Sequence, residues 1–228
     1  IDRRQINKAI KDNPEARIKT DEEIYDDKIV SITRYAASEE NNIKIIMLAG
    51  PSGSGKTTTA NMLKRRFGIM GISSDIISLD HFYLSPDKFP KDPDGEPDFE
   101  SVYALDPELM HKCFIELITN GESTIPYFSF TGGGRVGSRQ IKIAKNGVVV
   151  VEGIHALNPL IIDTLPADSL LKLYVSVESG IFEDDELILS PRDLRLIRRS
   201  IRDSIFRNAT VERTLEMWDG VIRGEKEY

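Results

Sequence analysis

The stretch Gly50-Pro-Ser-Gly-Ser-Gly-Lys-Thr57 decides the fold of this chain. It fits the pattern G-x-x-x-x-G-K-[ST], and it lies between an apolar run, Ile43–Ala49, and a segment with helical spacing, Thr57–Phe67. Glycines let the backbone N–H groups of such a loop turn inward on phosphate oxygens, and the following helix adds the positive end of its dipole. The strand–loop–helix context therefore predicts a phosphate-binding P-loop rather than a Gly/Ser-rich turn that matches by chance.

Two side chains of this loop have a defined task in phosphate chemistry. Lys56 supplies a point charge to the β- and γ-phosphates, and the Thr57 hydroxyl ligates Mg²⁺. The other residues of this stretch that we expect to contact the nucleotide are Gly50, Ser52, Gly53, Ser54, Gly55 and Thr58. The loop thus predicts binding of ATP or GTP together with Mg²⁺.

Strands and helices alternate along the rest of the chain. Ile72–Leu79, Val148–Val151 and Leu170–Val177 are predicted as strands, and Pro107–Thr119 and Pro191–Arg207 as helices. Four consecutive valines are typical of a strand that is buried on both faces, as in parallel sheets. We therefore predict a doubly wound α/β fold with a mostly parallel sheet, of the P-loop NTPase kinase type, with an arginine-rich lid helix.

Three local patterns give further expectations. A capping box at Thr20–Glu23 predicts a helix over about 21–38. Asn146-Gly147 predicts a hairpin between Gln140–Ala144 and Val148–Val151. The acidic run 183–186 predicts an exposed loop.

The chain is expected to divide into a helical N-terminal extension, residues 1–42, and a kinase domain, residues 43–228, with a truncated C-terminus. Residues 81–105 hold four prolines and predict a long loop of functional importance. Trp218 and Met217 are expected to pack a terminal helix against the core.

Composition excludes several classes of protein. The chain is 40% hydrophobic and 29% charged, with a net charge of −7, which disfavours binding to nucleic acid through its phosphates. The apolar runs are too short to span a membrane, and a single cysteine, Cys113, indicates a reducing, cytoplasmic setting. His81, His111 and His155 are scattered and are expected to be ordinary residues rather than metal ligands. The oligomeric state stays open.

Two acidic residues follow predicted strands. Asp80 closes Ile72–Leu79 and Glu152 closes Val148–Val151, and ligands of open α/β sheets bind at this carboxyl edge. A carboxylate there can hold Mg²⁺ or accept the proton of an attacking hydroxyl. By position alone, Asp80 could equally cap a helix or be solvated in a loop, and Glu152 could be an exposed residue at a strand end.

Four arginines share one face of the last predicted helix, at positions i, i+3, i+4 and i+7: Arg195, Arg198, Arg199 and Arg202. Such a row suits a lid that closes over phosphates during transfer. The alternative is a solvated helix paired through Asp193 and Asp203, which would account for two of the four arginines at most.

No G-protein signature accompanies the P-loop. Asp92-Pro-Asp-Gly95 matches D-x-x-G, but it lies in the proline-rich loop with no strand before it, and no N-K-x-D motif follows. We interpret Asp92–Gly95 as a turn.

Taken together, these pieces resemble the uridine kinase and phosphoribulokinase family over roughly residues 43–210. The matching segments, in family order, are Gly50–Thr58, Leu79–Tyr83, Asp98–Asp106, Pro126–Arg135, Val151–Ile154 and Leu194–Asp203. The ending, with Met217-Trp218 and Arg223-Gly-Glu225, resembles larger uridine kinase-like proteins in which a threonyl-tRNA-synthetase-like domain precedes the kinase.

The resemblance implies phosphorylation of a nucleoside 5′-hydroxyl by ATP or GTP, with Asp80, Lys56 and Arg202 as the catalytic residues. Asp80 would be the general base and would surround Mg²⁺ with Thr57 and Glu152. The residues implied in acceptor binding are Asp80, Tyr83, Glu100, Phe128, Phe130 and Arg135. The arginines of 195–202 would contact phosphate or acceptor.

This chain departs from the family where the base is read. Uridine kinases use an Asp to hold the ribose hydroxyls, and the matching position in this chain is Glu100. They read the base with a Tyr and a His, and the matching positions here are Phe128 and Gly133. Ser129 replaces an Asp, while Phe130 is retained. Two alternatives stay open: a kinase of the same family acting on another alcohol, such as a sugar phosphate or a pantothenate-like compound, and a nucleotide-binding regulatory module without transfer.

Overall fold

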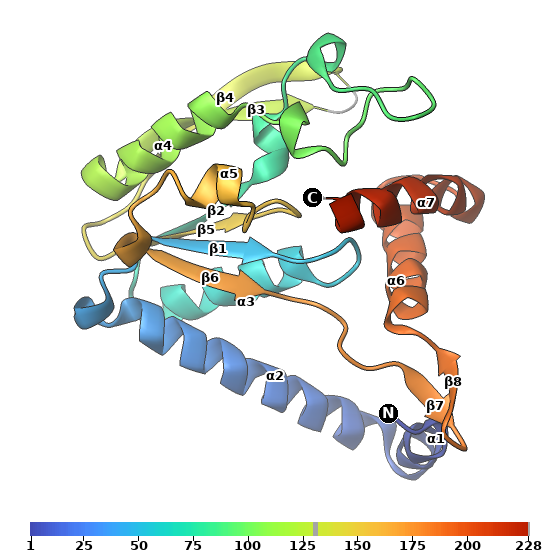
Figure 1. Ribbon diagram of the computed structural model, residues 1–228. Helices are drawn as coiled ribbons and strands as arrows, with labels where there is room; N and C mark the ends of the chain where they lie inside the picture. Colours follow the sequence, from blue (N-terminus) through green and yellow to red (C-terminus); the bar gives the residue numbers. More distant parts are fainter. Residues whose placement is uncertain (130–131, 228) are drawn as a thin grey trace.

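A parallel sheet forms the centre of the molecule. The computed structural model describes residues 1–129 and 132–227 (Figure 1). Strands β1 (Ile45–Ala49), β2 (Ser74–Ser78), β5 (Val148–Glu152) and β6 (Leu170–Tyr174) pair in parallel in the order β2-β5-β1-β6. All four carboxyl ends therefore meet at one edge of the sheet, as the alternating pattern predicts.

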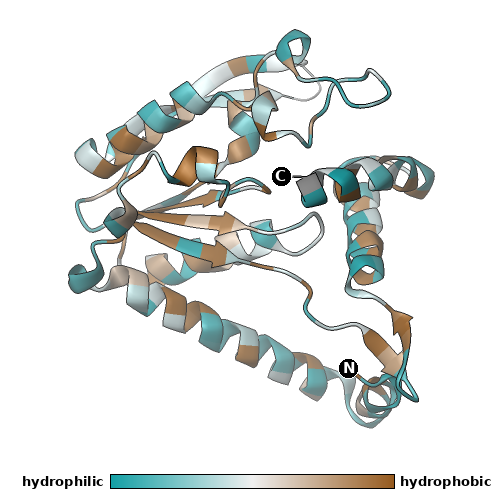
Figure 2. Ribbon diagram, viewed as in Figure 1, coloured by the Kyte–Doolittle hydropathy of each residue, from teal (hydrophilic) through white to brown (hydrophobic). Residues whose placement is uncertain are grey.

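Alternate residues of each strand face different layers. Ile46 and Leu48 belong to a core shared with α2 (Pro14–Ala37) and α3 (Lys56–Ile69). Met47 and its neighbours on the opposite face pack in a second core with α4 (Pro107–Asn120), together with the short α5 (Pro159–Ile162). Figure 2 shows the central strands as the most continuously apolar part of the chain. Because both faces are covered by helices, the doubly wound α/β prediction is confirmed.

The helix that was predicted over 21–38 begins earlier. The side chain of Asn13 accepts a hydrogen bond from the Ala16 N–H at 3.0 Å, with Pro14 at the first helical position. Thr20 lies inside this helix, and its hydroxyl donates to the Ala16 carbonyl at 3.0 Å. The capping box at Thr20 was therefore wrong, because a stronger N-cap lies seven residues upstream.

An antiparallel hairpin lies over the second core. It joins β3 (Glu122–Ser129) to β4 (Gly134–Lys142), with Thr124 opposite Gln140. The predicted hairpin around Asn146-Gly147 was wrong, since both edges of β5 are taken by β1 and β2.

The loop over 81–105 is irregular, as predicted. It holds isolated turns of 3₁₀ helix at Leu79–Phe82, Pro86–Lys88 and Val102–Ala104, and two isolated antiparallel bridges, Tyr83 with Leu105 and Lys91 with Pro97. Two further 3₁₀ turns, Glu39–Asn41 and Ala167–Ser169, precede β1 and β6. The segment Asp92–Gly95 forms a turn, in which the Gly95 N–H donates to the Asp92 carbonyl at 3.0 Å.

The C-terminal elements stand apart from the sheet. The predicted acidic loop is the tight turn of a hairpin, β7 (Ile181–Glu183) and β8 (Glu186–Leu189), which leads into α6 (Pro191–Phe206) and α7 (Val211–Glu227). Helix α1 (Arg3–Asp12) lies beside this hairpin in Figure 1, and Arg3 forms an ion pair with Glu183. No helix in the described ranges is long and apolar enough to cross a membrane.

Trp218 of α7 is buried with Arg195 of α6 over its ring, and Met217 is 45% exposed, so neither belongs to the two cores around the sheet.

Candidate active site

The P-loop backbone favours glycine where it meets α6. Gly53 has a φ of +75°, and a Cβ there would stand 2.6 Å from the Arg195 carbonyl oxygen of α6. The hydroxyl oxygen of Ser54 is buried without a hydrogen-bond partner within the described residues. A buried polar atom in a loop of converging N–H groups fits a loop that binds an anion such as phosphate.

Lys56 opens α3 and extends over the loop. Its ammonium group donates to the carbonyl oxygens of Gly50 at 2.9 Å and Pro51 at 3.2 Å. Burial lowers its pKa, while the charges of Glu152 and Asp80 raise it. The two carboxylates thus favour the cationic form of the lysine in a site that otherwise disfavours charge.

The two candidate acids lie at the same edge of the sheet. Glu152 ends β5 opposite Ser78 of β2. Asp80 lies in the 3₁₀ turn that follows Ser78, and its backbone N–H donates to the Ser78 hydroxyl oxygen at 3.4 Å. Burial raises the pKa of Asp80, and the nearby Lys56 lowers it. Burial also raises the pKa of Glu152, which Lys56 opposes and Asp80 reinforces. The three groups therefore form one electrostatic unit beside the P-loop.

The oxygen atoms of Thr57, Asp80 and Glu152 are the kind of ligand that could hold a magnesium ion beside the P-loop. Thr57 is exposed at the first turn of α3, next to Lys56. Mg²⁺ is usually held by one or two carboxylates together with substrate phosphates rather than by a cage of protein ligands. No group of three or more acidic, histidine or cysteine side chains suited to a metal occurs among the described residues.

The arginine row of α6 lies against the P-loop, but it is not a row of unpaired cations. Arg195 forms a bidentate ion pair with Glu225 of α7, at 2.6 and 2.8 Å, and also donates to the Ser52 carbonyl at 3.1 Å. Arg199 donates to the Ser52 hydroxyl at 2.7 Å. Both guanidinium groups are buried, so α6 is docked on the loop through them.

Asp203 pairs with two of the four arginines and also with Arg207, at 3.6 Å, so its single charge is shared among three guanidinium groups. It pairs with Arg199 at 3.3 Å and with Arg202 at 2.8 Å. Asp193 does not share this role in the described structure, because its carboxylate accepts from Ser190 in a capping box. Arg198 is exposed and has no ion pair within 1–129 and 132–227, and its Nη2 lies 3.1 Å from where a Cβ on Gly55 would stand. It is thus the arginine of the row best placed to meet an incoming phosphate.

The loop over 81–105 brings Tyr83 and Glu100 to the same side of the cleft. The Tyr83 hydroxyl donates to the Phe99 carbonyl at 2.6 Å, and burial raises the pKa of its phenol well above the usual value. Burial raises the pKa of Glu100 too, opposed by Arg199 and reinforced by Glu225. Glu100 therefore faces the lid helix and the end of α7.

Two further residues implied by the resemblance, Phe128 and Arg135, are held by contacts within the protein. Phe128 is buried in the second core, with its ring 5.5 Å from that of Tyr83. Arg135 pairs with Asp106, the N-cap of α4, at 2.8 Å and donates to the Phe82 carbonyl at 3.3 Å. Phe130 lies outside the described residues.

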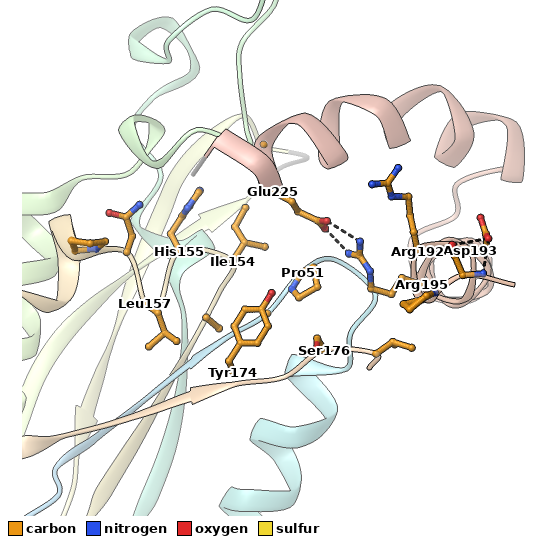
Figure 3. Close-up of a pocket in the computed structure, with 18 residues that line it drawn as sticks. Pro51, Ile154, His155, Leu157, Tyr174, Ser176, Arg192, Asp193, Arg195 and Glu225 are labelled. Atoms are coloured by element: carbon orange, nitrogen blue, oxygen red, sulfur yellow. Dashed lines mark hydrogen bonds and ion pairs between the residues drawn. The ribbon is translucent and has the colours of Figure 1, made fainter. Parts of the chain in front are cut away.

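A cavity of about 820 Å³ opens on one side of the P-loop (Figure 3). Its walls include Pro51, His155, Tyr174, Arg195 and Glu225. His155 is buried, its Nε2 lies 2.9 Å from the Glu100 carbonyl oxygen, and burial lowers its pKa to about 4. From the sequence, His155 was expected to be an ordinary residue, and Glu225 was noted only as part of the Arg223-Gly-Glu225 ending, because neither position has a motif with a known chemical task.

The strand order, the P-loop and the acidic pair define the class of P-loop kinases. The model of the Phosphoribulokinase / Uridine kinase family matches residues 45–226, and the chain belongs to this family. The predicted resemblance is thereby confirmed.

Individual relatives are moderately similar. A uridine kinase of Saccharomyces cerevisiae is 30% identical over 78% of this chain, which spans only 32% of that protein. A uridine kinase of Staphylococcus haemolyticus is 26% identical over 80% of this chain and 79% of its own length. Among solved structures, a possible uridine kinase from Bacillus stearothermophilus has a TM-score of 0.54 at 18% identity, covering 86% of this chain and 95% of the other, and supports the fold.

Proposed function

We propose that this chain transfers the γ-phosphoryl group of ATP or GTP to a hydroxyl group of a small, nucleoside-like acceptor. The observation that carries the proposal is the position of Asp80, which directly follows β2 at the carboxyl edge of the sheet, next to the end of β5 and near Lys56 of the P-loop. A carboxylate in this position can accept the proton of an attacking hydroxyl. Its pKa, raised by burial, makes it a better proton acceptor than an ordinary aspartate.

Each part of the site has a task in this transfer. Lys56 turns from its loop carbonyls to the β- and γ-phosphates, and Arg198 meets the phosphates from the lid. Mg²⁺, held by Thr57, Asp80 and Glu152, would neutralise charge on the phosphate oxygens. Because phosphoryl transfer needs little covalent chemistry from the protein, positioning and charge stabilisation account for most of the catalysis.

The surroundings of the acceptor support recognition of hydroxyl groups more than of a base. Glu100 offers a carboxylate that can bind a vicinal diol. Phe128 is packed in the core and Gly133 has no side chain, so neither supplies a hydrogen bond to a base edge. Apolar contacts discriminate by only about 10–200-fold, whereas hydrogen bonds to a substrate can discriminate by roughly 10⁴–10⁵. The uridine kinase names of the relatives support a nucleoside, and we propose that the base is read weakly.

A panel of acceptors under one Mg·ATP condition tests this proposal. Uridine, cytidine, adenosine, 2′-deoxyuridine and simple diol sugars are compared by kcat/KM. Loss of the 2′-hydroxyl should reduce kcat/KM more than a change of base. A preference for uridine over adenosine above about a thousandfold would refute weak base reading. Turnover confined to a sugar phosphate or a pantothenate-like alcohol would favour a kinase of the same family that acts on another alcohol. Nucleotide binding without any acceptor-dependent turnover would favour a regulatory module.

A further inference from the structure

The last turn of α7 lies between the P-loop and the loop over 81–105, which we call the acceptor loop because it carries Tyr83 and Glu100. Arg223 pairs with Asp92 of the acceptor loop, with 3.5 Å between Nη2 and Oδ2. A Cβ on Gly224 would overlap the Cβ of Glu100, so the helix backbone touches the acceptor side directly. Glu225, the next residue, reaches the P-loop. Three successive residues thus connect the two sides of the cleft, and Figure 1 shows the end of the chain between them.

Glu225 occupies hydrogen-bond donors that a phosphate would use. One carboxylate oxygen accepts from the Ser52 backbone N–H at 2.9 Å and from Arg195 at 2.6 Å, and the other accepts from Arg195 at 2.8 Å. A loop N–H group and a guanidinium from the lid are the donors with which P-loop kinases hold phosphate. The side chains of Arg195 and Glu225 are only 9% and 15% exposed, and Figure 3 shows the pair among the residues that line the cavity.

Two anions cannot share these donors. A phosphate oxygen at Ser52 would stand against the Glu225 carboxylate, and at this degree of burial the repulsion is only weakly screened. The same carboxylate acts on Glu100, whose pKa it raises. The end of α7 therefore conflicts with ligands on both sides of the cleft.

We propose that the end of α7 is an internal competitor of the nucleoside triphosphate, in which the Glu225 carboxylate takes the place of a phosphate on Ser52 and Arg195. The triphosphate binds only after this turn has withdrawn, and withdrawal also frees the side of the cleft that holds Glu100. The inference rests on the proposed donor site. It predicts that the apparent affinity for Mg·ATP is reduced by the fraction of molecules with the turn in place.

The first experiment compares Mg·ATP binding by calorimetry in the wild type, Glu225→Gln and Glu216→Gln. Glutamine keeps the size of the side chain but loses the charge that holds Arg195. Glu216 lies on the same helix in an exposed pair with Arg213, so its variant controls for the change in net charge. We expect Glu225→Gln to bind Mg·ATP about tenfold more tightly, while Glu216→Gln matches the wild type.

The opposite results have separate meanings. Equal or weaker binding of Mg·ATP by Glu225→Gln would refute the proposal that Glu225 competes with the triphosphate. Weaker binding would show instead that Glu225 holds Arg195 in position to bind phosphate. If neither the wild type nor any variant binds Mg·ATP, the donor site itself fails and the competitor with it.

A second measurement needs no variant. Hydrogen exchange of residues 219–227 in the wild type should become faster when Mg·ATP binds, because the turn leaves its contacts. Unchanged or slower exchange there, in a protein that binds Mg·ATP, overturns the proposal even if Glu225→Gln does not fold.

Discussion

Replacing His155 with glutamine should remove a pH-dependent part of the protein's stability. His155 is 5% exposed, and its Nε2 is the donor in the 2.9 Å hydrogen bond to Glu100, because a carbonyl oxygen can only accept. Burial is the largest cause that lowers its pKa from 6.5 to about 4. The folded protein therefore favours the neutral imidazole, and protonation at low pH favours the unfolded chain.

The size of the effect follows from the two pKa values. A group with a lowered pKa contributes stability that is fully present above 6.5 and is lost as the pH falls towards about 4. With 1.36 kcal/mol for each pH unit, the loss between pH 7 and pH 5 is about 2 kcal/mol, and it approaches about 3 kcal/mol below pH 4. Asp80, Glu100 and Glu152, whose pKa values are raised, change stability in the opposite direction over their own ranges.

A comparison of variants isolates the contribution of His155. Glutamine can place its amide N–H near the position of Nε2 and keep the bond to Glu100, but it does not titrate. Urea unfolding at pH 7 and pH 5 should show that the wild type loses about 2 kcal/mol more than His155→Gln. The exposed His111→Gln should behave as the wild type. Equal losses in the wild type and His155→Gln would refute the argument that burial keeps this imidazole neutral.

The remaining predictions concern the proposed chemistry. Lys56→Ala should weaken or abolish Mg·ATP binding, because it removes the loop's own cation, and wild-type affinity by calorimetry would contradict the proposed P-loop role. Asp80→Asn should keep the Mg·ATP affinity within a few-fold but lower kcat by roughly 10²–10⁴, and near-normal turnover would show that Asp80 is not the base. Hydrogen exchange over 191–206 should slow when Mg·ATP and acceptor bind, and unchanged exchange there would argue against a lid.

The parts of the site that follow from local sequence could be predicted. A glycine-rich loop between a strand and a helix places its N–H groups at the start of that helix, and the ends of parallel strands meet at one edge. For this reason Lys56, Asp80 and Glu152 could be brought together from sequence alone. Their roles in catalysis stay predictions.

Features that depend on distant partners could not be predicted. The Asn146-Gly147 turn signal is local, but β5 finds its partners more than seventy residues away, in β1 and β2. The acid that pairs with Arg195 is Glu225, thirty residues further along and on another helix. The start of α2 is different, since Asn13-Pro14 is itself a helix-start signal that could have been preferred over Thr20.

The most direct test of the account is to detect the phosphorylated acceptor. Wild-type protein is incubated with Mg·ATP and uridine, and both ADP and the acceptor monophosphate are quantified by mass spectrometry. We expect one acceptor monophosphate for each ADP released, little ADP without acceptor, and formation of both products slowed by roughly 10²–10⁴ in Asp80→Asn. Release of ADP at the same rate without acceptor, or binding of Mg·ATP with no phosphorylated product from any acceptor in the panel, would contradict it.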